Sequence, residues 1–300
     1  FGLVSLMFLD TSINMAMQPF KMMVGDMVNE KQKGLAYSIQ SFLCNAGSLV
    51  GYLFPFIFAW IGLSNTAPQG VIPDSVIYSF YIGAAILILC VIYTSVKVKE
   101  MPPAEYAEYH GITEEEEHEK TNMLRLLIKA PKAFWTVGLV QFFCWFAFMF
   151  MWTYTNGSIA ANVFDAPTVE HITNGISKIV LDTKSLQYQE AANWVGVLFA
   201  VQAIGSVIWA ICIPMFKDRR FIYALSLVLG GIGFISTFFV HNQYVLFVSF
   251  LLIGCAWAAM LALPFTILTN ALSGGHMGTY LGLFNGTICI PQIVAAALGG

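Results

Sequence analysis

A stripe of polar side chains interrupts an otherwise apolar segment at the start of the chain. Asp10, Asn14, Gln18 and Lys21 follow one another at spacings of four, four and three residues. These spacings place all four side chains on one face of an α-helix. A carboxylate inside a bilayer costs about 2.5–3.5 kcal/mol on insertion scales, so such groups usually face a water-filled cavity and serve transport. We therefore expect Asp10 to bind and release a proton, and the stripe to contact a solute.

Two residues of this segment allow a second interpretation. Lys21 stands near one end of the segment, where its long side chain can also reach the membrane interface. Pro19 removes one backbone hydrogen bond, which either kinks the helix at a cavity or leaves a tolerated bend.

Neutral polar and aromatic residues recur on the later apolar segments. The further candidates for solute contact are Asn45, Gln141, Trp145, Trp152, Tyr154, Trp257, Asn285 and Gln292. Amides donate to and accept from hydroxyl groups, and flat rings cover the apolar faces of sugars. Taken singly, each amide can also join two helices and each Trp can belong to an interface belt. Taken together, the residues favour a neutral ligand rich in hydroxyl groups.

The composition indicates where these side chains must be held. Of the 300 residues, 58% are hydrophobic and only 10% are charged, and the mean hydropathy is +0.72. A soluble domain carries about 25% charged residues, so a soluble enzyme and a disordered protein are both excluded. With 14 Lys and Arg against 17 Asp and Glu, no basic surface is available for nucleic acid. The bulk of the chain must lie in lipid.

Eight apolar runs are long enough to cross a bilayer as helices, which needs about 20 residues each. They lie near 1–25, 34–61, 76–96, 133–157, 192–216, 220–241, 244–271 and 278–300. The runs are continuous rather than alternating, which disfavours the strands of a membrane barrel. The sequence therefore predicts an all-α, polytopic membrane protein.

Basic residues predict the orientation of these spans. Most of them fall in the first, third and fifth connections, whereas the opposite side carries only Lys178 and Lys184. The positive-inside rule then places the odd-numbered connections in the cytoplasm. The long third connection, 97–132, contains an acidic run at 114–117 and an amphipathic stretch at 123–127, and Thr113 with Glu116 forms a possible capping box.

This connection divides the chain into three predicted parts. Residues 1–96 carry three spans of an N-terminal helical half, 97–132 form a cytoplasmic linker, and 133–300 carry five spans of a C-terminal half. Both ends of the chain are apolar. We therefore expect a fragment of a twelve-helix transporter built from two halves of six, with three spans missing in front and one behind.

Other chemistry finds little support in the sequence. The six cysteines lie widely spaced in apolar runs, and His110 and His118 lack a metal-ligand spacing. No nucleophile–base set is visible, so an enzyme, a metal site and an organic cofactor are not expected. Residues 158–191 are expected to form a long polar outer loop, either a plain connection or a cover for an entrance.

Several motifs resemble the sucrose-type proton symporters of the glycoside–pentoside–hexuronide branch of the major facilitator superfamily. In the fourth-helix signature of that family an Asp is followed by Asn, Pro, a basic residue and a closing Asp; here Pro19, Lys21 and Asp26 follow Asp10 by 9, 11 and 16 positions. Further motifs resemble later parts of the family. Helix five is matched by Ala36-Tyr-Ser with Asn45-Ala-Gly47 and Gly51-Tyr52, helix seven by Trp145-Phe-Ala-Phe, and the loop after helix eight by Lys217-Asp-Arg-Arg220. Helix ten is matched by Gly254-Cys-Ala-Trp257 with Pro264-Phe265, and helix eleven by Gly282 with Asn285 and Pro291-Gln292.

The resemblance implies a major facilitator fold and proton-coupled uptake of a disaccharide or related glycoside by alternating access. It implies that Asp10 binds both proton and sugar, with Lys21 in place of the usual Arg. The plant pattern after Trp145-Phe is replaced by residues such as Trp152 and Tyr154, and the run 151–154 looks more like bacterial members linked with maltose or sucrose. We expect a monomer in the cell inner (cytoplasmic) membrane, with a sugar and the bilayer as partners, a proton as coupling ion and no nucleic acid. A sodium-coupled or uncoupled carrier of another neutral solute, or a non-transporting sugar sensor, remain alternatives.

Overall fold

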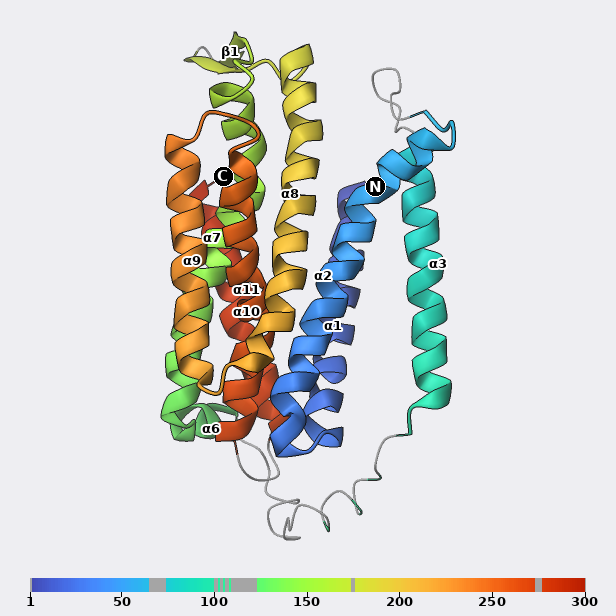
Figure 1. Ribbon diagram of the computed structural model, residues 1–300, viewed down its shortest axis with the longest axis vertical. Helices are drawn as coiled ribbons and strands as arrows, with labels where there is room; N and C mark the ends of the chain where they lie inside the picture. Colours follow the sequence, from blue (N-terminus) through green and yellow to red (C-terminus); the bar gives the residue numbers. More distant parts are fainter. Residues whose placement is uncertain are drawn as a thin grey trace. The chain divides into compact units, whose positions relative to one another are not determined.

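A computed structural model describes residues 2–64, 74–99, 123–173, 176–272 and 277–299, together with residues 102, 105 and 108. Long helices dominate this part of the chain (Figure 1). They are α1 (Gly2–Met27), α2 (Glu30–Trp60), α3 (Asp74–Lys97), α7 (Lys132–Asn162), α8 (Leu186–Cys212), α9 (Arg219–Phe239), α10 (Leu246–Ala271) and α11 (Met277–Gly299). Each of the eight predicted spans is confirmed as a helix, with ends that differ from the prediction by a few residues.

Seven of these helices are long and apolar enough to cross a membrane. They are α2 from Lys31, α3, α7, α8 extended through the short helix η1 (Ile213–Met215), α9, α10, and α11 from Gly278. Helix α1 is continuous through Pro19 but is not among the seven. The polar stripe, which made α1 a candidate for function, also lowers its mean hydropathy.

Local sequence signals explain where several helices begin and end. Ser185 caps α8, where its hydroxyl accepts from the backbone N–H of Tyr188, and the Asp218 carboxylate caps α9 by accepting from the backbone N–H groups of Arg220 and Phe221. Such caps satisfy amides that have no partner within the helix. Gly62 follows α2 with a φ of 97°, a backbone conformation that favours glycine.

The predicted outer loop at 158–191 is wrong in most of its length. Helix α7 continues to Asn162, and β1 (Thr168–Thr173) then pairs antiparallel with β2 (Ile176–Leu181) before α8 begins. Both strands are rich in Val, Ile and Thr, which favour extended backbone. The residues between them in the sequence are Asn-Gly, the pair most typical of a two-residue hairpin. The expectation overlooked these two signals.

The long connection before α7 contains the expected surface helix. Residues 123–127 fall within α6 (Met123–Lys129), which ends on a basic residue as the helix dipole favours. The predicted capping box of Thr113 and Glu116, the acidic run 114–117 and both His110 and His118 lie outside the described residues.

The chain separates into two compact units. Unit 1 comprises Phe1–Ser38, Glu100–Phe150 and Met260–Gly300, and unit 2 comprises Ile39–Lys99 and Met151–Ala259. Helices α2, α7 and α10 each contribute residues to both units. The division into an N-terminal half 1–96, a linker 97–132 and a C-terminal half 133–300 concerns the membrane fold of the family and stays a prediction.

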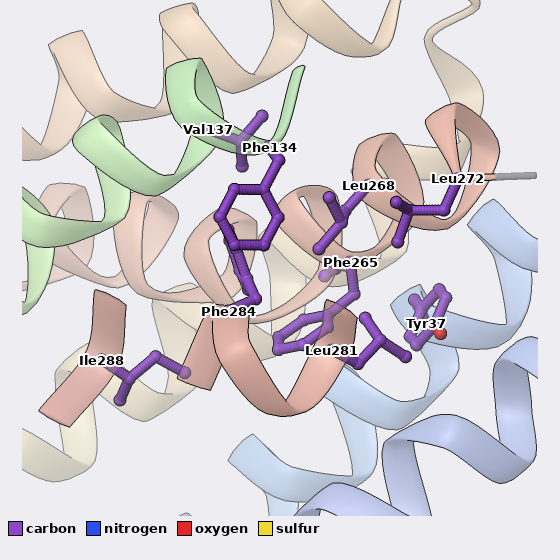
Figure 2. Packing of buried hydrophobic residues seen from close by; sticks show 10 residues of the cluster. Tyr37, Phe134, Val137, Phe265, Leu268, Leu272, Leu281, Phe284 and Ile288 are labelled. Atoms are coloured by element: carbon purple, nitrogen blue, oxygen red, sulfur yellow. The ribbon is translucent and has the colours of Figure 1, made fainter. Parts of the chain in front are cut away.

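The core of unit 1 is an aromatic cluster carried by α7, α10 and α11, with Tyr37 from α2 (Figure 2). Phe284 meets Phe265 and Phe134 edge-on, with ring centroids 5.8 Å and 5.7 Å apart. Edge-to-face pairs of this kind stabilise by about 0.5–1.5 kcal/mol beyond the area they bury. This cluster fixes the second half of α10 between α7 and α11.

The core of unit 2 depends on close approach between α8, α9 and α10. A Cβ atom added at Gly205 of α8 would lie 2.6 Å from the carbonyl oxygen of Leu251, and one added at Gly233 of α9 would lie 2.7 Å from that of Ser249. Small residues allow such contacts between membrane helices. Beneath the hairpin, α7, α8 and the start of α10 share a second apolar cluster that includes Ile159, Leu198 and Phe250.

Candidate solute-binding site

Asp10 lies on the exposed surface of α1, one turn before Asn14. The Asn14 amide donates to the backbone carbonyl of Asp10 over 2.9 Å, so this part of the stripe is tied together locally. The helix thereby holds the two side chains on one face, as their spacing predicted. The side chain of Gln18 lies outside the described residues.

Asp10 also has a neighbour on α11 that the sequence did not predict. Helices α1 and α11 are in contact, and the Asp10 carboxylate is near enough to act electrostatically on the Cys289 thiol. The Asn285 amide nitrogen lies 3.7 Å from the same sulfur, and its oxygen is buried with no hydrogen-bond partner among the described residues. Of these two predicted site residues, Asn285 contacts the Cys289 thiol and Asp10 lies within electrostatic range of it.

Lys21 is held among aromatic rings. Its ammonium group lies 4.1 Å from the centroid of the Phe265 ring, and the side chain is only 7% exposed. The Tyr37 hydroxyl donates to the Lys21 carbonyl over 3.2 Å, and the Tyr37 and Phe265 rings lie 6.1 Å apart. An ammonium over a ring face is attracted by the ring quadrupole. This burial favours a place inside the protein for Lys21 over a side chain that reaches the interface.

Gln141 on α7 is the most buried of the predicted amides in unit 1, at 1% exposure. Its Nε2 donates over 2.9 Å to the carbonyl of Met260 on α10. Its Oε1 is buried and has no hydrogen-bond partner in the part of the chain that the structure describes. One end of this amide therefore joins two helices, while the other end remains open to a donor.

Trp145 and Gln292 are two further predicted site residues of unit 1. Trp145, one turn after Gln141 on α7, is half-buried and packs against the aromatic core. Gln292 on α11 is half-buried and follows the buried Pro291.

Unit 2 brings together two of the predicted aromatic residues. The rings of Trp152 on α7 and Trp257 on α10 meet edge-on, with centroids 5.5 Å apart and planes at 81°. This contact joins α7 to α10 through two of the predicted aromatic residues. Tyr154 is exposed.

Asn45, also in unit 2, has internal partners. Its amide donates to the Ser41 carbonyl over 2.7 Å, and the Ser41 hydroxyl donates to the Ala258 carbonyl of α10 over 3.1 Å. Asn45 itself is fully buried. These contacts give Asn45 a role in joining α2 to α10, the alternative that the sequence left open for every single amide.

The structure thus divides the predicted contacts into two sets. Unit 1 holds Asp10, Asn14, Gln18, Lys21, Gln141, Trp145, Asn285 and Gln292, and unit 2 holds Asn45, Trp152, Tyr154 and Trp257. Sequence reasoning did not predict that Tyr37 and Phe265 contact Lys21, or that Cys289 lies near Asp10. Spacing along one helix cannot show such contacts, since the partners come from other helices. Among the described residues, no group of three or more His, Cys, Asp and Glu side chains is arranged to hold a metal ion.

These features define a polytopic, nearly all-α membrane protein with polar groups held between its helices. A family model described as Major Facilitator Superfamily matches residues 3–296. The chain belongs to this superfamily and is a multi-pass membrane transporter. Comparisons with curated proteins and with solved structures gave no match.

Proposed function

We propose that the protein is a proton-coupled symporter that takes up a disaccharide or a related glycoside by alternating access. We assign it to the glycoside–pentoside–hexuronide branch, as a monomer in the cytoplasmic membrane. The observation that carries this proposal is the pair of buried amide oxygens in unit 1, Gln141 Oε1 and Asn285 Oδ1, that have no hydrogen-bond partner in the described ranges.

Unpartnered acceptors favour a solute that brings hydrogen-bond donors. Leaving one buried acceptor unsatisfied costs about 1–3 kcal/mol, and a hydroxyl group from a solute removes that penalty. A sugar supplies many hydroxyls without a net charge to desolvate. Trp152 and Trp257 remain the predicted aromatic contacts, because flat rings cover the apolar face of a sugar.

Asp10 is the residue to which we assign the coupling proton. It is the carboxylate of the α1 stripe and lies within electrostatic range of Cys289, whose sulfur the Asn285 amide contacts. Protonation from outside would neutralise Asp10 before the sugar binds, and deprotonation inside would follow release of the sugar. At 100 mV one proton charge corresponds to about 2.3 kcal/mol, which supports roughly 50-fold accumulation of the solute.

Uptake of labelled maltose and sucrose into inside-negative, outside-acidic vesicles tests this proposal. We expect one of the two sugars to accumulate in the wild type, and a protonophore or Asp10→Asn to abolish the accumulation. Asp74→Asn is the matched control, because Asp74 is an exposed carboxylate in the first turn of another helix, α3. This control should accumulate sugar as the wild type does.

The same experiment separates the alternatives. Uptake that survives the protonophore but stops without sodium would replace the proton by sodium as the coupling ion. Uptake that equilibrates without accumulation under all conditions would indicate an uncoupled carrier. Saturable binding of a sugar without any exchange across the membrane would indicate a sensor and contradict the proposal.

A further inference from the structure

Pro264 leaves a backbone carbonyl of α10 without its helical partner. In an α-helix each carbonyl accepts from the N–H four residues later, and proline has no N–H. Pro264 lies inside α10, so the carbonyl four residues earlier, that of Met260, lacks its usual donor. Gln141 Nε2 donates to this carbonyl over 2.9 Å. The amide on α7 therefore takes the place of the N–H that Pro264 cannot supply.

This hydrogen bond fixes which end of the Gln141 amide points where. The Met260 carbonyl can only accept, so the NH₂ group must face it; a flipped amide would set two oxygens against each other. Oε1 is consequently directed away from Met260. It is buried, in a side chain that is 1% exposed, and meets no donor among the residues that the structure describes. Such an oxygen is an acceptor held in one orientation.

We propose that Gln141 Oε1 accepts a hydrogen bond from a hydroxyl group of the transported solute, and that Pro264 is the positioning residue that orients it. The inference rests on the proposed function in one respect, namely that the solute carries hydroxyl groups. It assigns a specificity-determining role to an acceptor-only contact. A solute position that meets Gln141 must donate a hydrogen, so fluorine or a methoxy group at that position is rejected even though both can accept.

Replacement of Pro264 by alanine changes this selectivity in a predictable direction. An alanine at this position supplies the backbone N–H to the Met260 carbonyl, so the Gln141 amide is no longer needed there and becomes able to rotate. A rotated amide can donate through Nε2 to a fluorine or methoxy oxygen. We therefore expect Pro264→Ala to weaken the preference for the hydroxyl over its fluorinated replacement, while the parent sugar is still bound.

A thermal double-mutant cycle without any sugar tests the link between the two residues. In purified protein, Gln141→Met should lower the melting temperature by a few degrees, because it leaves the Met260 carbonyl unpartnered. The same substitution in a Pro264→Ala background should cost clearly less. Gln202→Leu, which also removes a buried glutamine, is the control and should have the same effect in both backgrounds. Equal losses for Gln141→Met in both backgrounds would overturn the link.

Binding of maltose, sucrose and their monofluorinated derivatives tests the contact with the solute. For the sugar that the wild type binds, one fluorinated position should lower the affinity about fivefold to tenfold, the effect of one hydrogen bond. In Gln141→Met the parent sugar should bind correspondingly more weakly, and that position should no longer matter. This comparison needs no proline variant, so it decides even if Pro264→Ala does not fold.

The two tests separate failure of the inference from failure of the proposed function. If Gln141→Met keeps the full discrimination against every fluorinated position, the inference is wrong although sugar transport stands. If the wild type binds neither sugar, the proposed function and the hydroxyl contact both fail, while the thermal cycle still decides the link between Gln141 and Pro264.

Discussion

Polar side chains are used differently in two regions of this transporter. In the region of unit 2 where α8, α9 and α10 approach closely, several of them are paired across helices: Ser206 donates to the Gly254 carbonyl over 2.8 Å, and the Trp209 indole donates to Ser226 over 2.8 Å. In unit 1, Gln141 and Asn285 each carry a buried oxygen with no partner in the described part of the chain. The difference is between polar groups that are paired with a neighbouring helix and polar atoms that have no partner in the described ranges.

Helix α10 contains both arrangements along its length. Its first half presents Gly254 to the α8 backbone, and its second half contains Pro264 and a core packed around Phe265. Glycine lets a neighbouring backbone come so close that only small groups fit between the helices. Proline instead leaves a backbone carbonyl without its donor in the helix, so another helix must supply one. The comparison teaches that glycine marks where α10 packs tightly, whereas proline marks where its backbone takes a hydrogen-bond donor from another helix.

The largest effect is expected for Asp10, the carboxylate of the polar stripe on α1. Asp10→Asn should abolish accumulation, lowering the gradient from roughly 50-fold to none, while exchange of labelled for unlabelled sugar continues, because a neutral amide mimics the protonated acid. Counterflow and net accumulation measured in the same vesicles check this expectation. Loss of both activities would place Asp10 in binding rather than in coupling.

A substitution in the tightly packed region should affect folding instead. Gly233→Val places a Cβ against the Ser249 carbonyl and Ile253, whereas Gly231→Val on the same helix meets no described atom within 4 Å. Overpacking costs about 1–3 kcal/mol or more, so only Gly233→Val should lower the melting temperature by several degrees. Sugar affinity of the folded fraction should stay unchanged. Equal melting temperatures for the two variants would contradict the close packing.

The aromatic environment of Lys21 predicts a smaller effect. Lys21→Met removes the interaction with Phe265, which stabilises by about 0.5–2 kcal/mol, and should slow transport severalfold. Lys21→Arg should recover much of the rate, because a guanidinium also stacks on a ring. Transport rates of Lys21→Met, Phe265→Leu and the double variant check whether the two losses overlap. Strictly additive losses of rate would show that the contact between Lys21 and Phe265 does not contribute to transport.

The smallest effect is expected where polar groups are already paired. The Ser236 and Ser249 hydroxyls lie 2.7 Å apart, and Ser236→Ala removes this bond between α9 and α10. Such bonds within membranes contribute about 0.6 kcal/mol on average, so stability should fall slightly and sugar binding should not change. A changed sugar affinity in Ser236→Ala, measured by binding titration, would contradict the distinction between the two regions.

The sequence predicted the helices well because most spans are long apolar runs with few alternatives in lipid. It missed the hairpin of β1 and β2, although the Asn-Gly pair and the β-branched residues on either side were visible. Spacing along one helix also predicted that Asp10 and Asn14 share a face. It did not predict the contact of Lys21 with the Phe265 ring, or the hydrogen bond from Gln141 to the Met260 carbonyl. Such contacts depend on how distant helices pack. For Asn45 the choice between a joining role and ligand contact needed the structure in the same way.

The most direct test of the account is the external pH of a weakly buffered, de-energised cell suspension when maltose or sucrose is added. A proton symporter carries protons inward with the sugar, so we predict a transient alkalinisation of the medium that is absent in Asp10→Asn and in the presence of a protonophore. Sugar entry without any pH change in the wild type would contradict proton coupling through Asp10.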